Sequence, residues 1–228
     1  MTAHEELAGY VRSMSGAASL LPARGWQFGE FDPARARRAA VLILFGLRDE
    51  VAAGGVPVAT ANRDELDVLF VLRASSLKHH PGQVAFPGGA IDPDDPDEPA
   101  AALREAREET GVDSGGVHVL GCLPEVGLPV SNFMVSPVIG WWARESPVHA
   151  VDTAESELVF RVPVSTLLDP AHRRTAVVRR SGFTSRTPAF LAPEAVIWGF
   201  TAMLLDAVFE GLGWTRPWDH SVEIPAPL

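Results

Sequence analysis

The chain has 228 residues, with 19 Lys and Arg against 29 Asp and Glu, so its formal net charge is −10 at pH 7. Apolar residues make up 46% of the composition, which excludes the disordered and fibrous classes and leaves room for a substantial core. The length favours one domain, because a single core serves chains of up to roughly 250 residues. The negative charge argues against nucleic acid or an anionic membrane surface as the main partner, whereas a small-molecule substrate is compatible with it.

The first residues predict an N-terminal lead, 1–35, that forms part of the same globule as the rest of the chain. It contains one short helix and a Gly/Pro-punctuated segment, 21–26, that we expect on the surface. The chain starts with acidic residues where a secretory signal would be basic and then apolar. The longest apolar stretch, 195–205, is shorter than the ~18 residues of a membrane helix. We therefore expect a cytoplasmic protein without a membrane span.

Residues 36–228 predict a single domain that ends in a C-terminal helix. Apolar runs rich in strand formers predict strands at 39–45, 66–73, 117–123, 133–142 and 158–162. Residues 48–64 lack periodicity and predict a loop. Helices are predicted at 100–110, preceded by Asp97-Glu98-Pro99 and followed by Gly111, and roughly at 193–211. Strands and helices without regular alternation predict an α+β fold, with a mixed sheet sandwiched between helices.

The single cysteine, Cys122, cannot form an internal disulfide. It lies in the apolar run 119–123, so we expect a buried structural thiol and not a nucleophile.

Three carboxylates share one face of the predicted helix over 100–110. Residues three and four apart are neighbours on a helix, so Glu105, Glu108 and Glu109 lie within about 100° of one another and repel. A hard divalent cation that binds carboxylate oxygens and a phosphate would reverse that repulsion. A solvated charged helix surface is the alternative. The glycine turn over 86–89 and the acidic loop that follows it favour the metal site, since glycines permit close approach of the backbone to a ligand.

These residues resemble the Nudix box, G-x5-E-x7-R-E-U-x-E-E-x-G-U, in which U is an aliphatic residue. The match runs from Gly89 to Val112, and its second half is complete from Arg104 onward. Two departures are visible, because the sixth residue after Gly89 is Asp95 instead of Glu, and eight residues instead of seven separate it from Arg104. In the family that Glu braces the loop through the Arg, and we expect Asp95 or Asp92 to take its role.

The extra residue and the segment upstream resemble the coenzyme A pyrophosphatase branch of the Nudix superfamily. That branch carries the signature L-L-x-x-R-[SA] followed by G-x-x-x-F-P-G-G, which is similar to residues 71–89, and weaker likenesses continue to about residue 210. The resemblance implies a Nudix-type α/β/α sandwich. It also implies hydrolysis of the diphosphate bond of coenzyme A or its derivatives to 4′-phosphopantetheine and adenosine 3′,5′-bisphosphate.

The resemblance implies roles for the helix carboxylates. Mg²⁺ or Mn²⁺ would be held by Glu105, Glu108 and Glu109, and would neutralise the diphosphate and acidify a bound water. Glu105 is the first candidate for the general base, and Glu155 is the second. Arg104 is expected to orient Glu105 and the loop.

Substrate contacts are expected from Arg73, Lys78 and the turn at Gly88 and Gly89. For Arg73 a structural ion pair is the alternative. One or both of the adjacent His79 and His80 are expected to be solvent-facing loop residues, because neighbouring residues rarely converge on one ion.

Two other functions stay open at the level of the sequence. One is a Nudix pyrophosphatase that acts on another dinucleotide or nucleoside diphosphate derivative. The other is a non-catalytic ligand-sensing Nudix domain, which only the Glu-to-Asp change at position 95 favours. The sequence also leaves open whether a homodimer forms, for which the N-terminal lead or the last helix would be the contact.

Overall fold

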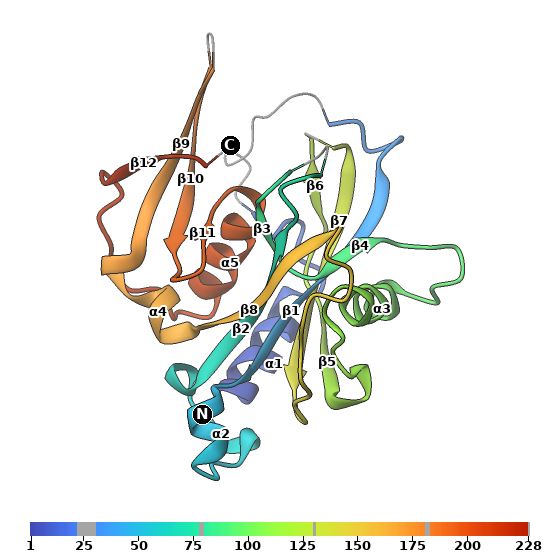
Figure 1. The fold of residues 1–228 in the computed structure, drawn as a ribbon, viewed down its shortest axis with the longest axis vertical. Coiled ribbons are helices and arrows are strands. Elements are labelled where there is room, and N and C mark those ends of the chain that lie inside the picture. The colour runs from blue at the N-terminus through green and yellow to red at the C-terminus, as the bar shows by residue number, and fades with distance from the viewer. Residues whose placement is uncertain (22–30, 78–79, 130, 181–182, 228) are drawn as a thin grey trace.

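The computed structural model describes residues 1–21, 31–77, 80–129, 131–180 and 183–227 (Figure 1). Its helices are α1 (Ala3–Met14), α2 (Asp49–Ala53), α3 (Glu98–Thr110), α4 (Val164–Leu168) and α5 (Gly199–Gly211). The strands of a first sheet are β1 (Arg37–Leu47), β2 (Leu66–Arg73), β3 (Val84–Ala85), β4 (Gly88–Ala90), β5 (Val117–Cys122), β6 (Val126–Leu128), β7 (Phe133–Trp142) and β8 (Ser156–Pro163). Those of a second sheet are β9 (Arg173–Arg180), β10 (Phe183–Leu191), β11 (Val196–Ile197) and β12 (Glu223–Pro225).

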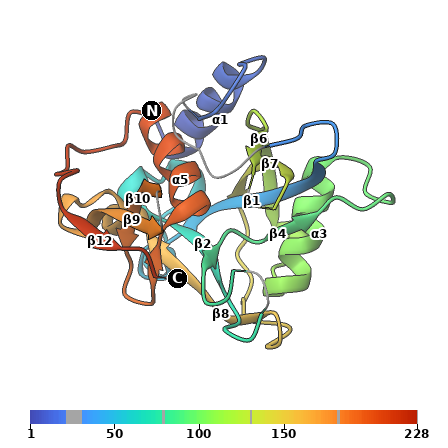
Figure 2. The same cartoon turned by 90° about the horizontal axis from the view of Figure 1, so that it is seen from above.

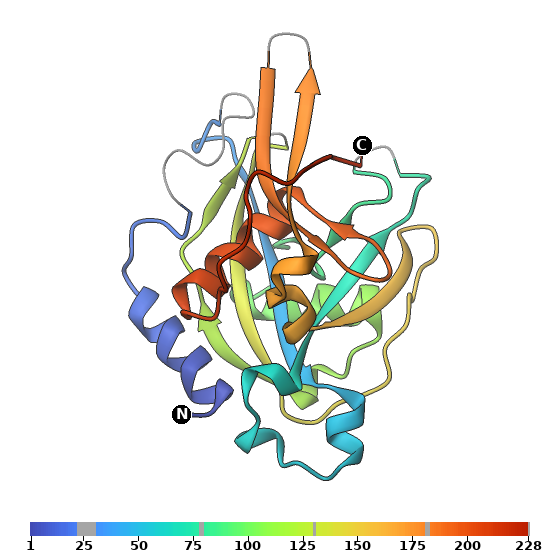
Figure 3. The same cartoon turned by 90° about the vertical axis from the view of Figure 1, so that its left-hand side faces the viewer.

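The first sheet is mixed, with β1 at its centre. β1 pairs in parallel with β7 and antiparallel with β2 and β4. The strand order is β3-β2-β1-β7-β5, with β8 also paired to β2 and β6 to β7. The smaller sheet has the order β11-β10-β9-β12 and packs against α5 (Figure 3).

Alternating side chains of β1 build two cores, one on each face of the first sheet. Successive side chains of a strand point to opposite faces. Leu42 and Leu44 belong to one core together with the buried alanines of α3. Ile43 and Phe45 belong to the other core, which includes buried residues of α1 and α5. The sheet is therefore covered by α3 on one face and by α1 and α5 on the other (Figure 2), which confirms the predicted sandwich of a mixed sheet between helices.

The N-terminal helix α1 packs onto the body of the protein. Leu7 is fully buried, and Tyr10 and Val11 are 7% exposed. The backbone N–H of Ala3 donates to the carbonyl of Ala61 at 2.9 Å, and the indole N–H of Trp214 donates to the Glu6 carboxylate. None of the helices in the described part of the chain has the length and hydropathy required to cross a membrane.

Helix α3 forms where its terminal residues predict it. The Asp97 side chain accepts a hydrogen bond from the backbone N–H of Ala100 at 2.8 Å and so caps the N-terminus, with Pro99 in the first turn. Gly111 ends the helix with a left-handed φ of 71°, and its N–H donates to the Arg107 carbonyl at 3.0 Å.

Several expectations need correction. Residues 48–64 contain α2 and a short 3₁₀ turn and are not simply a loop. The last helix begins at residue 199 instead of 193, because residues 196–197 pair with β10 as β11. The hairpin of β9 and β10 was not predicted. Of the segment 21–26, residues 22–26 lie outside the described residues.

The prediction for Cys122 was wrong, because this thiol is exposed. Cys122 is the last residue of β5, which lies at the edge of the sheet. The pairing of β5 with β7 shifts between Val119 and Gly121, so the apolar run does not continue as a buried strand. Although the residue is exposed, partial desolvation of its thiol, followed by the charge of Glu98, raises the pKa of the thiol above its ordinary value.

Candidate functional site

The two glycines of the turn let the backbone approach both the sheet and helix α3. β4 pairs with β1, so that Gly88 lies opposite Val41 and Gly89 lies opposite Ala40. A Cβ atom added at Gly88 would lie 2.3 Å from the carbonyl oxygen of Ala40. One added at Gly89 would lie 2.5 Å from the carboxyl carbon of Glu105. Close approach to the backbone of β1 therefore requires glycine at position 88, whereas at position 89 the neighbour is the movable end of the Glu105 side chain.

Glu109 is the helix carboxylate whose charge is most strongly disfavoured by burial. Its Oε2 accepts a hydrogen bond from the backbone N–H of Gly88 at 3.0 Å. Its pKa is raised to about 7, chiefly by burial, with smaller contributions from the charges of Glu105 and Glu155. The Gly88 hydrogen bond and the charge of Arg73 lower it. The environment therefore disfavours the charge of Glu109 as long as no cation offsets it.

Glu105 and Glu108 have different exposures on the same helix. The Glu105 side chain is 19% exposed and packs against Gly89, and burial raises its pKa above the ordinary value although Arg104 opposes this. The Glu108 side chain is 52% exposed.

Arg104 connects the acidic loop to the helix carboxylates. Its Nε and Nη2 donate to the two oxygens of Asp95 at 3.1 and 2.9 Å, which is a bidentate pair. Its Nη1 donates to Glu105 at 2.9 Å and to Glu108 at 3.0 Å. Asp92 lies farther from the guanidinium, at 3.6 Å, although its own N–H donates to Asp95 at 2.8 Å. Of the two acids considered for bracing the loop, Asp95 makes the two-point contact.

The carboxylates fit a hard divalent cation by their chemistry but are not arranged around one. No three acidic, histidine or cysteine side chains in the described ranges converge as a ready ligand set. Arg104 holds Glu105 and Glu108, and the Gly88 N–H holds Glu109. Carboxylate oxygens are nevertheless the ligands that Mg²⁺ and Mn²⁺ prefer, and burial disfavours the charge of both Glu105 and Glu109 without a cation.

Arg73 ends β2 beside these carboxylates. The pairing of β2 with β8 shifts between Leu72 and Arg73. The Nε atom of Arg73 is buried and has no hydrogen-bond partner among the described residues. Its charge lowers the pKa of Glu109, which places the guanidinium in the electrostatic range of the site. Lys78, the other cation expected to contact substrate, lies outside the described residues.

Glu155 lies on the loop before β8, and its side chain is exposed. Its backbone carbonyl accepts a hydrogen bond from the N–H of Ala74 at 2.9 Å, next to Arg73. Its charge contributes to the raised pKa of Glu109, so the sheet brings Glu155 to the same region as the helix carboxylates.

The arrangement of His80 was not predicted from the sequence. It is half-buried, its backbone φ is 55°, and its Nδ1 lies 2.9 Å from Oε1 of Gln83. His80 is therefore not fully solvent-facing, and His79, the other histidine of that expectation, lies outside the described residues. Pro81 and Gly82 after it are a turn signal that could have pointed to this geometry.

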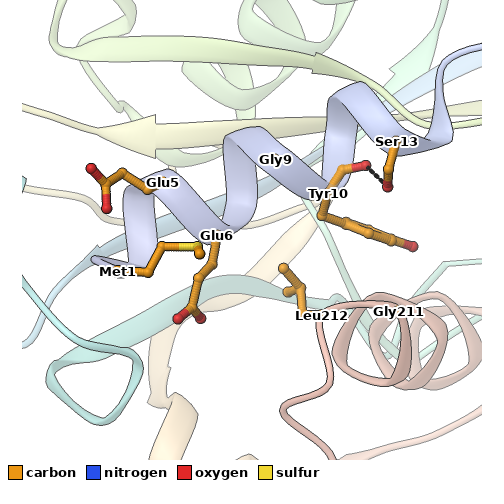
Figure 4. Close-up of a pocket in the computed structure, with 8 residues that line it drawn as sticks. All are labelled: Met1, Glu5, Glu6, Gly9, Tyr10, Ser13, Gly211 and Leu212. Atoms are coloured by element: carbon orange, nitrogen blue, oxygen red, sulfur yellow. Dashed lines mark hydrogen bonds between the residues drawn. The ribbon is translucent and has the colours of Figure 1, made fainter.

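A separate cavity of about 300 Å³ lies between α1 and α5 (Figure 4). Its lining consists of residues from these two helices and their ends: Met1, Glu5, Glu6, Gly9, Tyr10, Ser13, Gly211 and Leu212. None of the carboxylates on α3, and neither glycine of the turn, contributes to it. Because α1 and α5 cover the opposite face of the sheet from α3, this cavity is not part of the carboxylate site.

Comparisons with known proteins match more than half of this chain. A family model described as the NUDIX domain matches residues 49–180. A protein of Cronobacter sakazakii named uncharacterized Nudix hydrolase NudL is 38% identical over 159 residues, which cover 70% of this chain and 81% of that protein. The protein of the same name from Escherichia fergusonii is 35% identical over 159 residues, with the same coverage.

Solved structures with similar folds carry related names. A Nudix hydrolase from Nitrosomonas europaea has a TM-score of 0.49 and 13% identity, and the match covers 90% of this chain and 92% of that chain. The Nudix hydrolase RenU from M. smegmatis has a TM-score of 0.42 and 24% identity, and the match covers 56% of this chain and 70% of that chain.

Proposed function

We propose a reaction for this chain on the basis that it belongs to the Nudix family. The proposed reaction is the divalent-metal-dependent hydrolysis of the diphosphate bond of coenzyme A or its derivatives. The products would be 4′-phosphopantetheine and adenosine 3′,5′-bisphosphate. The observation that carries the proposal is the group of helix carboxylates beside the glycine turn, with Glu109 bonded to the Gly88 N–H and Glu105 next to Gly89, within the electrostatic range of the Arg73 charge.

The helix carboxylates supply the metal ligands in this proposal. Glu105, Glu108 and Glu109 would hold Mg²⁺ or Mn²⁺, which when bound neutralises the diphosphate oxygens and acidifies a water. The buried environments of Glu105 and Glu109 support this assignment, since a bound cation would offset the electrostatic cost of their charges.

We assign the general base to Glu105, with Glu155 as the second candidate. Burial raises the pKa of Glu105, which makes its carboxylate a better proton acceptor. The contact of Gly89 with the Glu105 carboxylate fixes this group beside the turn. Arg104 is assigned a positioning role, because its donors are directed at Asp95, Glu105 and Glu108.

The coenzyme A assignment rests on the segment 71–89 and its resemblance to the signature of that branch. Coenzyme A carries a 3′-phosphate besides its diphosphate, so its site needs donors outside the metal ligands. Arg73 is assigned to a substrate phosphate, and its unpartnered Nε supports this assignment. Lys78 is proposed as a second cation, and the turn at Gly88 and Gly89 is proposed to lie against the diphosphate.

A substrate panel tests the proposal. Purified protein with Mg²⁺ or Mn²⁺ is incubated with coenzyme A, dephospho-coenzyme A, and a set of dinucleotides and nucleoside diphosphate derivatives, and the products are identified by mass spectrometry. The expected result is cleavage of coenzyme A to the two named products, and no turnover after exhaustive chelation. Faster turnover of another diphosphate would replace the substrate assignment, and binding without turnover of any compound would indicate a sensing domain.

Two variants test the residue roles. Glu105→Gln is expected to lower kcat by at least about a hundredfold, the scale of a lost general base. If Glu155→Gln lowers kcat by that amount and Glu105→Gln does not, the base is Glu155. Arg73→Ala is expected to lower kcat/KM for coenzyme A by roughly ten- to a hundredfold and to reduce the preference over dephospho-coenzyme A. An unchanged preference, with a lower melting temperature, would assign Arg73 a structural role.

A further inference from the structure

The end of the loop between β2 and β3 makes two hydrogen bonds to the backbone of Arg73, which also pairs with Ser156 of β8. The N–H of Arg73 donates to the carbonyl of Gln83 at 3.0 Å, and the carbonyl of Arg73 accepts from the N–H of Gly82 at 3.1 Å. The N–H of Gln83 donates in turn to the carbonyl of His80, at 3.4 Å. The position of Arg73 therefore depends on the turn formed by residues 80–83.

Residues 80–83 form a tight turn in which His80 has an unusual backbone conformation. Pro81 presets its own φ, and Gly82 takes a φ of 64°, which favours glycine. His80 has a φ of 55°, which is uncommon for a residue other than glycine, and a following proline restricts the backbone further. Such a conformation persists only where surrounding contacts determine it.

The side chains of His80 and Gln83 supply that contact. Nδ1 of His80 lies 2.9 Å from Oε1 of Gln83, and both residues are half-buried. With the amide oxygen facing the ring, the imidazole donates from Nδ1. This bond joins the first and last residues of the turn and so closes it.

The guanidinium of Arg73 has few contacts with the described residues that would fix its direction. Among the residues that the structure describes, no carboxylate lies within ion-pair distance of it, and its buried Nε has no hydrogen-bond partner. A long side chain with so few contacts to the described residues has several rotamers, so the direction in which it extends is set by the backbone from which it starts.

We propose that His80 and Gln83 are positioning residues that fix Arg73 for substrate binding. The proposal rests on the proposed function, in which Arg73 contacts a phosphate of the substrate. Breaking the bond between the two side chains would loosen the turn that binds the N–H and carbonyl of Arg73, while the pairing of Arg73 with β8 and every carboxylate of α3 stay untouched.

A double-mutant cycle with Arg73 tests this role. Gln83→Met keeps the length of the side chain and removes the acceptor, and it is expected to raise KM for coenzyme A roughly tenfold with a smaller change in kcat. In the Arg73→Ala background the same change is expected to have no further effect, because the residue that it positions is gone. Ser76→Ala, an exposed residue of the same loop, is the control and is expected to change neither constant.

Two further measurements separate positioning from general destabilisation. ¹⁵N NMR of the histidine side chains is expected to show His80 protonated at Nδ1 in the wild type and a loss of that preference in Gln83→Met. His80→Asn, which tolerates a positive φ and retains a side-chain donor, is expected to keep KM closer to the wild type than His80→Ala does. The melting temperature of each variant is measured alongside.

The outcomes distinguish this inference from the proposed function. If Arg73→Ala raises KM and Gln83→Met does not, or if the two effects on KM add fully, the positioning role is wrong and the proposed function stands. If Arg73→Ala itself leaves the kinetics of coenzyme A unchanged, the phosphate contact of Arg73 is wrong, and the positioning role falls with it. A wild-type His80 that is protonated only at Nε2 would also refute the positioning role.

Discussion

Replacement of Glu109 by glutamine should make the metal-free protein more stable and much less active. Burial raises the pKa of this carboxyl from its ordinary value of 4.5 to about 7. One unit of pKa corresponds to about 1.4 kcal/mol, so the ionised form destabilises the fold by up to about 3 kcal/mol above pH 7. The amide oxygen of the introduced glutamine would still accept from the Gly88 N–H, so the variant removes the charge without losing that hydrogen bond.

The sign of the pH dependence follows from the raised pKa. The folded protein keeps the proton on Glu109 to a higher pH than the unfolded chain does, so this proton favours folding at low pH. The contribution is fully present below pH 4.5 and is lost as the pH rises through about 7. The difference between Glu109→Gln and the wild type is therefore expected to be small at pH 4.5 and largest at pH 8.

Urea unfolding in the presence of EDTA at several pH values measures this difference. We expect the variant to be about 1–3 kcal/mol more stable at pH 8, or about 3–9 °C higher in Tm. Glu108→Gln is the matched control, because its side chain is 52% exposed and its pairing with Arg104 contributes only a few tenths of a kcal/mol. Equal differences at pH 4.5 and pH 8, or a less stable Glu109→Gln at pH 8, would refute the reasoning.

The effect of Mg²⁺ on Tm and kcat tests whether Glu109 is also a metal ligand. Mg²⁺ is expected to raise the Tm of the wild type, because a ligand that binds only the folded state stabilises it. The Glu109→Gln variant is expected to lose most of that stabilisation and to fall at least about a hundredfold in kcat, the scale of a lost charge contact in the transition state. Full stabilisation of the variant by Mg²⁺ would remove Glu109 from the metal ligands.

Two other pairs of variants make contrasting predictions. Arg161, whose side chain is 15% exposed, binds Asp67 at 2.9 Å, so Arg161→Met strands a buried carboxylate and should cost about 3–5 kcal/mol in urea unfolding. Asp67→Asn should lower the free energy of unfolding by less, because burial raises the pKa of Asp67 to about 7 and so disfavours its charge. A larger loss of stability for Asp67→Asn than for Arg161→Met would contradict this. Gly88→Ala should lower the Tm, because its Cβ meets the backbone of β1. Gly89→Ala meets the movable Glu105 carboxylate instead and should lower kcat with a smaller change in Tm; the reverse ranking in Tm would contradict the geometry.

The elements that could be predicted from the sequence are those with local chemical signals at their ends. Asp97 and Gly111 mark the termini of α3, and the structure has a side-chain cap at one and a left-handed φ at the other. The strands 66–73 and 133–142 have the same bounds in the structure, because each is rich in apolar strand formers.

The hairpin of β9 and β10 could not be predicted in the same way, because its strands are rich in arginine, serine and threonine. Their stability depends on a distant segment. Glu223 of β12 binds both Arg179 and Arg186, and β12 pairs with β9 in parallel. Contacts between residues so far apart in the sequence leave no pattern within β9 or β10 from which the hairpin could be predicted.

The candidate site was predictable in its residue types but not in its contacts. Helical periodicity alone placed Glu105, Glu108 and Glu109 on one face. It gave no indication that Glu109 is the most buried of the three, because that burial comes from the Gly88 backbone, which only the pairing of β4 with β1 brings to the helix.

The departure from the Nudix box at Asp95 also has a physical explanation. Aspartate is one methylene shorter than glutamate, so at the same position it would reach less far toward Arg104. The loop between this position and Arg104 is one residue longer than in the box, which lets the chain bring Asp95 closer. The result is a bidentate pair at 3.1 and 2.9 Å, with Asp95 only 7% exposed. Because Asp95 holds Nε and Nη2, Arg104 keeps its place in the loop even when Nη1 releases Glu105 and Glu108 to a cation. The substitution and the insertion therefore offset each other, and together they preserve the bracing of Arg104 against the loop.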